Sequence, residues 1–399
     1  MPTTFQFFAP DFQHDPFPTY AQMRAEGVSR IEPGGFLALS RHADVLAALR
    51  TPTVFSSSGF VQAFEPPWVG YNPGAHTMLS LDPPEHTKLR SLVSRAFVSS
   101  VLDRTRPFIQ GLVNGAVDRL ASGGEIEVVA EIATPVTAGT IGHFLTLDPA
   151  LHARCKQWCD VLASVTPVPM GPDHEERVHR AIRELTGYLT SLVEERRRAP
   201  GDDLVSLLAR AEVDGQRLCD KDLMAFLFLL LVAGLETTVN LISKSVVVLS
   251  ERDEVMDRLR GNAALIPQFV EEMLRYDPPT HSLFRFVLSD TEVAGQKVPA
   301  GSVVMLMLAA ANRDAQQFEN PEVFDLDRDP QGALAFGFGA HFCIGMALAK
   351  LEARLTLESL LRRFRRFERV SPAITWNHTF TVRGPKTLPV RAVVQPNPG

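Results

Sequence analysis

One stretch of the sequence decides how the rest is interpreted: Phe336-Gly337-Phe338-Gly339-Ala340-His341-Phe342-Cys343-Ile344-Gly345-Met346-Ala347. A glycine-rich loop presents a single cysteine here, and the apolar spacing that follows predicts a helix beginning at about Ile344. A thiolate at a helix N-terminus is stabilised by the positive end of the helix dipole and by free backbone N–H groups. Gly339 and Gly345 lack a Cβ atom, which lets the backbone approach a flat cofactor closely. The pattern favours Cys343 as an anionic sulfur ligand of a metal.

Other interpretations of this stretch exist. A lone buried cysteine is most often just a small apolar side chain, and a cysteine nucleophile beside His341 would suit a hydrolase. Gly337 and Gly339 begin like a dinucleotide-binding fingerprint, but the third glycine position holds Phe342 and that interpretation fails. The cysteine nucleophile therefore stays open at this point, next to the metal ligand.

The whole chain has an ordinary globular composition. Its 399 residues are 45% apolar and 22% charged, with a net charge of −6, which excludes general disorder and disfavours nucleic acid or an anionic membrane as a partner. Four cysteines, at positions 155, 159, 219 and 343, do not make a disulfide framework and fit a cytoplasmic protein. Four prolines among the first twenty residues argue against a signal peptide or an N-terminal membrane helix.

The pattern along the chain predicts a mainly helical protein with small β-sheets. The longest apolar run, Leu223 to Leu235, has about 13 residues; a bilayer needs about 20, so we expect the buried central helix of a large domain over about 220–250. We predict one domain over residues 1–399. Its helix-rich core should lie at about 80–275 and 340–368, and its β-rich parts at about 30–40, 285–307 and 379–394.

The pattern Phe336-x-x-Gly339-x-His341-x-Cys343-x-Gly345 resembles the haem-binding signature of the cytochrome P450 monooxygenases, of the soluble bacterial type. The resemblance implies haem b (iron protoporphyrin IX) as the cofactor, with Cys343 as the iron ligand. It also implies the family's fold, in which the haem lies between the long central helix and the helix after the cysteine loop.

A second motif of the family lies inside the apolar run. The segment Ala233-Gly234-Leu235-Glu236-Thr237-Thr238 resembles the family's oxygen-activation motif, which makes Glu236 and Thr237 the acid–alcohol pair for proton delivery and places Ala233 beside the cofactor. Many relatives have aspartate rather than glutamate at the acid position. Taken alone, the segment is equally explained by a threonine that bonds its own helix and a glutamate that reaches solvent.

Two further sets of charged residues match the family. Glu272 and Arg275 share one helical face at i, i+3 spacing, and the resemblance implies that they pair with Arg328 in a structural triad. By the same resemblance His86, Arg90, Arg285 and His341 would bind the haem propionates. Without it, each of these residues is most simply a surface charge.

The substrate can only be described as apolar. By analogy with the family, the pocket would be lined by the loop around 60–77, the segment 162–170, the central helix, the segment 280–283 and the turn around Phe380. The residues named for it are Leu229, Leu230, Ala233, Thr280, Leu283 and Phe380. Apolar side chains favour an apolar ligand, but they do not separate a terpenoid from a steroid, a fatty acid or a polyketide. Core packing explains each of these side chains equally well.

The expected function is therefore monooxygenation. The resemblance implies that one oxygen atom from O2 is inserted into the substrate, and that an external ferredoxin or flavodoxin with its reductase supplies the electrons. Basic residues at Lys88, Arg90, Arg95 and along 362–366 could form the docking face. We expect a monomer without nucleic-acid or membrane partners. A peroxide-driven peroxygenase and a non-catalytic haem-binding protein are the alternatives, and the acid–alcohol pair argues against both.

Overall fold

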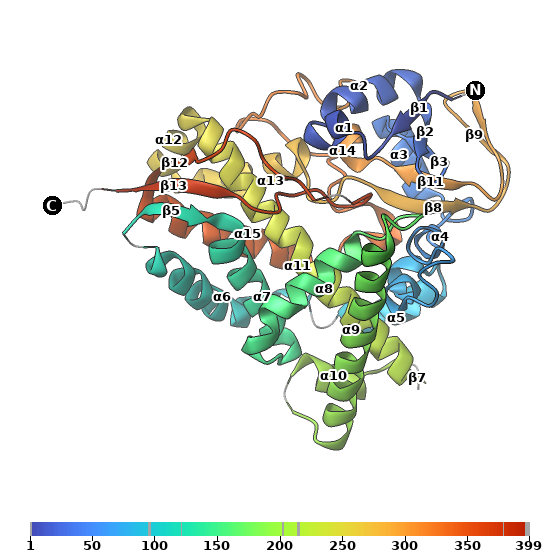
Figure 1. Ribbon diagram of the computed structural model, residues 1–399, viewed down its shortest axis with the longest axis horizontal. Coiled ribbons are helices and arrows are strands. Elements are labelled where there is room, and N and C mark those ends of the chain that lie inside the picture. The colour runs from blue at the N-terminus through green and yellow to red at the C-terminus, as the bar shows by residue number, and fades with distance from the viewer. Residues whose placement is uncertain are drawn as a thin grey trace.

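The computed structural model describes residues 2–94, 97–120, 122–201, 203–213, 216–377 and 379–395. Helices make up most of the molecule, and a β-rich part that includes the N-terminal strands occupies one corner (Figure 1). The helices are α1 (Pro10–His14), α2 (Phe17–Glu26), α3 (His42–Arg50), α4 (Gly59–Phe64), α5 (Glu85–Ser94), α6 (Ser99–Arg119), α7 (Thr134–Leu145), α8 (His152–Ala163), α9 (Pro172–Arg198), α10 (Leu204–Arg210), α11 (Asp220–Glu251), α12 (Asp253–Gly261), α13 (Ile266–Tyr276), α14 (Leu308–Ala311) and α15 (Met346–Arg363).

The strands form small sheets. A six-stranded sheet has the order β1-β2-β3-β11-β8-β4, a three-stranded sheet has the order β12-β13-β5, and two hairpins are made by β9 with β10 and by β6 with β7. The bounds are β1 (Thr4–Gln6), β2 (Val28–Glu32), β3 (Phe36–Leu39), β4 (Phe55–Ser56), β5 (Gly124–Glu127), β6 (Glu212–Val213), β7 (Gln216–Arg217), β8 (Leu283–Val287), β9 (Thr291–Val293), β10 (Gln296–Val298), β11 (Val303–Leu306), β12 (Phe364–Arg369) and β13 (Pro389–Val394).

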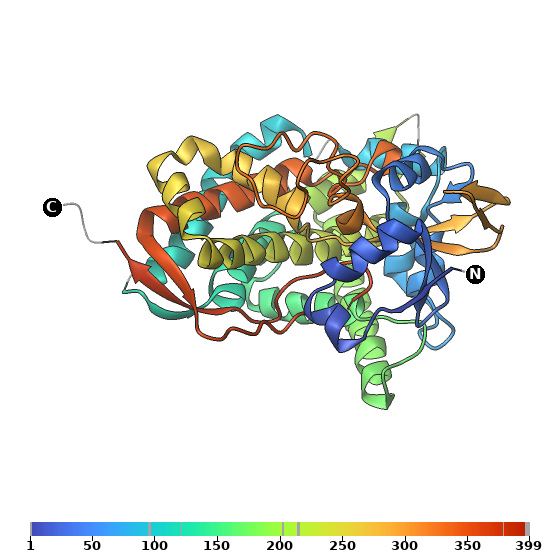
Figure 2. The ribbon, with the colours of Figure 1, turned by 90° about the horizontal axis from the view of Figure 1, so that it is seen from above.

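Helix α11 is the centre of the helical part. It runs through the middle of the molecule with other elements on both sides (Figure 2), and it packs against α7, α8, α9 and α15. Within the described ranges it is the one helix long and apolar enough to cross a membrane, but 78% of its most apolar window is buried inside the structure. Its apolar side chains belong to the largest hydrophobic cluster, so its hydrophobicity is used in the core.

The predicted mainly helical fold with small sheets is confirmed, but several element predictions are wrong in detail. The β-rich part predicted at about 379–394 contains one strand, β13, which pairs with β12 and β5. Residues 379–388 form a loop, because Gly384 and Pro385 interrupt the extended pattern. The helix after the cysteine loop begins at Met346 rather than Ile344 and ends at Arg363, since Phe364 and Phe367 turn inward from strand β12. The prediction of one domain over 1–399 stays a prediction.

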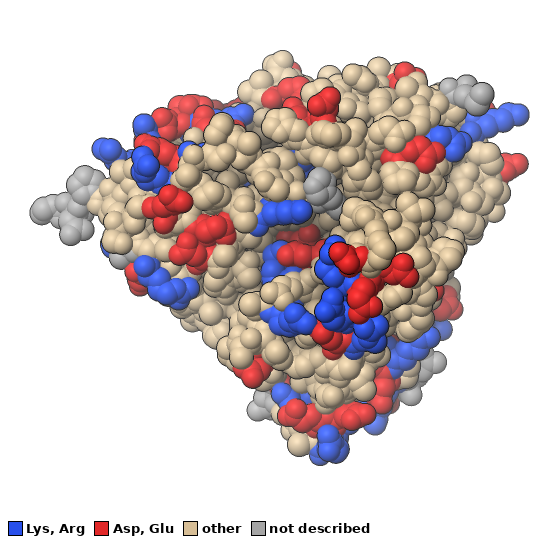
Figure 3. Space-filling model, viewed as in Figure 1, with Lys and Arg blue, Asp and Glu red and all other residues tan. Residues whose placement is uncertain are grey.

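Charges of both signs are interspersed on the face shown in Figure 3, and they gather over α8 and α9. The 27-residue helix α9 ends in Arg196, Arg197 and Arg198. Arg196 and Arg197 pair with carboxylates of their own region, Asp203 and Asp220. These pairs tie the end of α9 to α10 and α11.

Candidate functional site

Cys343 lies at the end of a tight loop that precedes α15. The loop turns at Gly337 and Gly339, whose φ angles of +70° and +71° are readily adopted by glycine. The Cys343 N–H donates to the Phe336 carbonyl at 3.0 Å, which closes the loop. Because α15 begins at Met346, the cysteine stands just before the first helical turn.

The surroundings of Cys343 have opposing effects on the pKa of its thiol. Burial raises its pKa, whereas the backbone N–H groups of Gly345 and Met346 and the charge of Arg90 lower it. A metal ion bonded to the sulfur would favour the thiolate outright. Among the described residues, no group of three or more His, Cys, Asp or Glu side chains could hold a metal ion.

Cys343 borders a cavity that lies between α11 and the start of α15. Ala233 is exposed although it stands in the middle of the buried helix α11, because it borders this cavity. Most of the predicted site residues meet here, although they come from segments far apart in the sequence. The predicted residues in the wall are His86, Arg90, Leu229, Leu230, Ala233, Thr237, Thr280, Leu283, Phe336, His341, Cys343 and Gly345.

Arg90 makes one edge of this cavity cationic, and His86 and His341, whose pKa values are lowered by burial, line it as neutral side chains. The rings of His86 and His341 lie 4.0 Å apart between centroids, and Arg90 Nη2 donates to the Phe342 carbonyl at 2.6 Å. His341 Nε2 is 2.9 Å from Ser57 Oγ. Burial, together with the charges of His86, Arg285 and Arg90, lowers the pKa of His341 to about 3.

Arg285 stands behind this edge rather than in the cavity wall. It is 4% exposed, and its Nη1 donates to the Phe284 carbonyl at 2.7 Å. Burial lowers its pKa to about 10, and the charge of Asp82 opposes that shift. A buried guanidinium has five N–H donors, so a site with this group favours an anionic ligand.

The residues present fit a haem. A thiol that would ionise on binding a metal, a cavity beside an exposed alanine and a cationic edge are what an iron porphyrin with two carboxylates requires. His86 Nδ1 is buried and has no hydrogen-bond partner among the described residues, which leaves it free to bind a carboxylate of a ligand.

Glu236 and Thr237 lie at a second cavity, which shares Leu229, Ala233 and Thr237 with the first. Thr237 Oγ1 donates to the Ala233 carbonyl at 2.6 Å. Glu236 does not reach solvent, being 3% exposed, and it accepts from Asn377 Nδ2 at 3.1 Å. Burial raises the pKa of Glu236 to about 8, so both of its protonation states are accessible near neutral pH.

The predicted triad is assembled, and it is almost completely buried. Glu272 Oε1 accepts from Arg275 Nη2 at 2.7 Å and from Arg328 Nε at 3.2 Å, and Glu272 Oε2 accepts from Arg275 Nε at 2.8 Å. Arg275 Nη1 also donates to the carbonyls of Asn312 and Pro321. These bonds tie α13 to the segment that leads into the cysteine loop.

Among the residues predicted to bind the cofactor or the substrate, three do not line either cavity: Gly339, Arg285 and Phe380. Gly339 shapes the backbone through its positive φ, and Arg285 acts through its charge on His341. The prediction of Phe380 as a pocket residue is wrong. Its ring packs against Phe7, Phe8 and other aromatic rings in a separate core cluster, because the loop that carries it turns its neighbours Thr381 and Val382 toward the cavity instead.

Sequence reasoning missed other members of the two walls. Gly337, Phe342, Ile344 and Leu348 could have been found, because they lie within the cysteine motif and the helix after it. Met78, Phe97 and Ile141 come from three other segments, and nothing in their local sequence marks them. The further residues of the first cavity that were missed are Leu79, Phe226, Gly234, Thr238, Leu241, Leu274, Pro279, Leu308, Ala335, Ala349 and Glu352.

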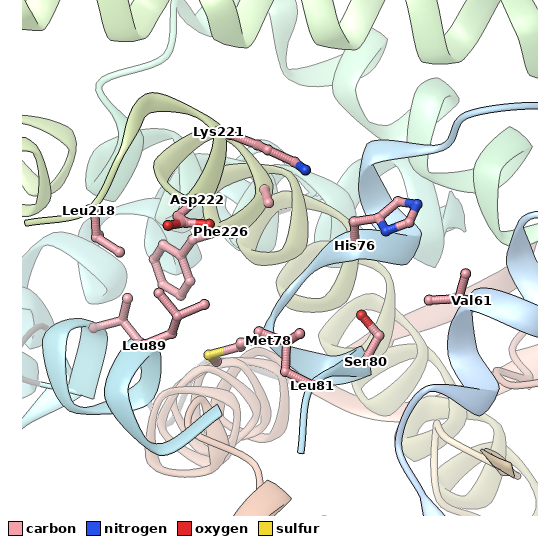
Figure 4. Close-up of a pocket in the computed structure, with 12 residues that line it drawn as sticks. Val61, His76, Met78, Ser80, Leu81, Leu89, Leu218, Lys221, Asp222 and Phe226 are labelled. Atoms are coloured by element: carbon pink, nitrogen blue, oxygen red, sulfur yellow. The ribbon is translucent and has the colours of Figure 1, made fainter. Parts of the chain in front are cut away.

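A third pocket, of about 230 Å³, lies beside the first cavity. Met78 and Phe226 line both spaces. Figure 4 shows Lys221, Asp222 and His76 around this pocket, with Leu89 and Phe226 on its apolar side. None of the predicted site residues lines it.

Comparisons with known proteins agree with this geometry. Residues 144–386 match the family model described as Cytochrome P450. The chain is 36% identical over 390 residues to cytochrome P450 monooxygenase PikC of Streptomyces venezuelae, covering 96% of this chain and 92% of that protein. Cytochrome P450 CYP109Q5 from Chondromyces apiculatus has a similar structure, with a TM-score of 0.90, 36% identity and coverage of 99% and 100%. CYP109E1 from Bacillus megaterium in complex with testosterone matches with a TM-score of 0.82, 32% identity and coverage of 94% and 99%.

Proposed function

Because this chain belongs to the cytochrome P450 family and is an oxidoreductase of the monooxygenase type, we propose that it hydroxylates an apolar small molecule at a haem b held by Cys343. The overall reaction would be RH + O2 + 2e⁻ + 2H⁺ → ROH + H2O. The observation that carries the proposal is the convergence of Cys343, the cationic edge and the Ala233–Thr237 segment on one cavity. A terpenoid, a steroid, a fatty acid and a polyketide are all compatible with its apolar wall, and the testosterone bound by CYP109E1 makes steroids a reasonable first class to test.

Cys343 and the cationic edge would hold the cofactor. The Cys343 sulfur would bind the iron, Arg90 and Arg285 would offset the charge of the propionates, and His86 and His341 would bind the propionates as neutral hydrogen-bonding groups. Haem bound through a thiolate supplies the redox centre for dioxygen and an electron-rich sulfur ligand that favours O–O cleavage.

The protein's own residues would orient the substrate and deliver protons. Leu229, Leu230 and Leu283 present apolar surface, which would exclude water and hold an apolar molecule near the cofactor. Thr237 would hold a proton at Oγ1 beside Ala233, and the Glu236 carboxyl would resupply it, since both protonation states of this group are accessible.

Electrons would come from a separate ferredoxin or flavodoxin with its reductase. Lys88 is exposed on α5, and Arg90 of the same helix contacts the carbonyl of Phe342 in the cysteine loop, so we place the docking face there. Arg95 lies outside the described residues. The basic run at 362–366 begins at the far end of α15, about 25 Å along the helix from Cys343, which is too remote for a primary docking site. We further propose a cytoplasmic monomer.

The test is turnover with a panel of apolar compounds. The protein should bind them with a change in the spin state of the haem and should form hydroxylated product with a reduced ferredoxin and O2. Product with hydrogen peroxide but none with reduced ferredoxin would favour a peroxygenase instead. A haem spectrum without any turnover would favour a haem-binding protein that is not an enzyme.

A further inference from the structure

The acid of the proton-delivery pair is held by a residue from a distant loop. Glu236 Oε1 accepts from Asn377 Nδ2 at 3.1 Å, across 141 positions of sequence. Asn377 lies in the loop between β12 and β13, which also carries Phe380, but Asn377 itself was not among the predicted site residues. Its contact with Glu236 is a direct side-chain bond at a buried position, since Glu236 is 3% exposed.

Asn377 is fixed in one orientation by its own loop. Its backbone N–H donates to the Gly384 carbonyl at 3.0 Å, and the Gly384 N–H donates to Asn377 Oδ1 at 2.9 Å. Because Oδ1 is occupied as an acceptor, the amide must present Nδ2, a donor, to Glu236. The contact is therefore built to donate to a carboxylate.

The same loop packs closely against the face of α11 that carries Glu236. A Cβ atom at Gly384 would lie 1.9 Å from Asn240 Oδ1, and Asn240 is one helical turn beyond Glu236. The loop is also bonded to the cavity wall, because Val382 bridges to Thr280 and the Arg383 N–H donates to the Pro279 carbonyl at 2.9 Å. Asn377 is thus held rigidly with respect to both α11 and the cavity.

Side-chain length explains why this chain has glutamate at a position where many relatives have aspartate. An aspartate would withdraw the carboxyl by about one C–C bond, roughly 1.5 Å. The bond of 3.1 Å to Asn377 would then exceed any hydrogen-bond distance. The additional methylene of Glu236 is what lets the carboxyl reach across to the loop.

We propose that Asn377 is a positioning residue for proton delivery, which holds the Glu236 carboxyl at the cavity wall beside Thr237 and favours its ionised form. This inference rests on the proposed monooxygenase function. Asn377 itself lines neither of the two cavities, and it acts through its hydrogen bond to Glu236.

The charges around Glu236 agree with this role. Burial raises the pKa of Glu236 to about 8, the charge of Asp160 raises it further, and Lys156 and the hydrogen bond from Asn377 lower it. Lys156 and Asp160, both on α8, form an ion pair with each other. The thiol of Cys159, also on α8, has a pKa well above its usual value because it is buried, so it stays neutral. Removal of Asn377 should therefore raise the pKa of Glu236.

The experiment is a pH titration of the Glu236 carboxyl by difference infrared spectroscopy on the haem-loaded protein, with the band assigned by its loss in Glu236→Gln. In Asn377→Ala the midpoint should rise by about one pH unit, the size expected when a carboxylate loses a hydrogen bond. In Asn377→Asp, which keeps the side-chain volume but opposes two carboxylates, it should rise further. Product formed per electron pair should fall in both variants around neutral pH, and Asn114→Ala, an exposed asparagine on α6, should match the unmodified protein in both measurements.

A double variant separates positioning from a general disturbance of the loop. In a Glu236→Asp background, where the contact is already lost, Asn377→Ala should change neither the midpoint nor the coupling. An unchanged midpoint in both Asn377 variants would overturn the proposal, and so would a shifted midpoint with unchanged coupling. The infrared titration requires no turnover, so a failure of the monooxygenase assignment would be seen separately, as absence of product in the unmodified protein.

Discussion

The Glu272 carboxylate and the Arg275 guanidinium form a bidentate pair in which both side chains are completely buried. Their two bonds are 2.7 and 2.8 Å long, and the exposed fraction of each side chain is 0%. Removal of one partner from such a pair leaves an uncompensated charge in the core, which typically costs about 3–5 kcal/mol. The pair joins α13 to the segment before the cysteine loop, so its loss should also loosen the loop.

The first prediction follows from this pair. Glu272→Gln should lower the free energy of unfolding by about 3 kcal/mol or more and should yield protein with less haem. The neighbouring Glu271, which is partly exposed and pairs with Lys350, supplies the control, because Glu271→Gln should cost at most about 1 kcal/mol. Chemical unfolding and the ratio of haem to protein absorbance measure both effects. Equal losses for the two variants would contradict the structural role of the triad.

The second prediction concerns the buried cation Arg285. Arg285→Met should weaken haem retention by a factor of about 10 or more, the usual effect of losing a charge-assisted hydrogen bond. The same change should make the haem-free protein no less stable, because an apolar side chain then replaces a buried charge. Haem transfer to an acceptor protein measures the loss of haem retention. Thermal unfolding of the haem-free form measures its stability. Unaltered haem transfer would show that Arg285 does not act on the cofactor.

The third prediction concerns pH. Glu352 is buried on α15, and burial raises its pKa to about 8, although a hydrogen bond with Thr140 lowers it. Since the folded pKa lies above the ordinary value of about 4.3 for an unfolded chain, this group's contribution to stability is complete below about pH 4 and is lost as pH rises toward 8. Glu352→Gln cannot ionise, so it should gain stability relative to the unmodified protein between about pH 5 and 8. Free energies of unfolding at several pH values, measured for both proteins, would show this gain. The same dependence on pH in Glu352→Gln and in the unmodified protein would contradict it.

The fourth prediction tests the close packing of the loop onto α11. Gly384→Ala should destabilise the protein by about 1–3 kcal/mol through overpacking, because its Cβ would lie 1.9 Å from Asn240 Oδ1. Gly187→Ala in the middle of α9 is a matched control. Its Cβ would meet nothing within 4 Å, so it should stabilise by about 0.5–1 kcal/mol. The thermal midpoint should fall in Gly384→Ala and rise in Gly187→Ala. Midpoints that move in the same direction would refute the close approach of Gly384 to Asn240.

The sequence predicted those parts of the site that follow from local patterns. Cys343, Phe336 and Gly345 lie in one motif, and Ala233 and Thr237 share a helix, so spacing alone brings them together. The pairing of β13 with β5 and the contact between Glu236 and Asn377 join segments more than 100 residues apart, and no local periodicity encodes such pairings. Phe380 is another example of this limit. Its apolar character is consistent with burial, but it does not reveal which hydrophobic cluster the ring joins.

The most direct test of the central claim is the visible spectrum of the reduced, carbon monoxide-bound protein. A bond between the Cys343 sulfur and haem iron predicts the red-shifted Soret band of thiolate-ligated haem, and predicts that Cys343→Ala lacks it. A spectrum typical of imidazole-ligated haem, no haem absorbance after haemin is supplied, or an unchanged band in Cys343→Ala would contradict the account.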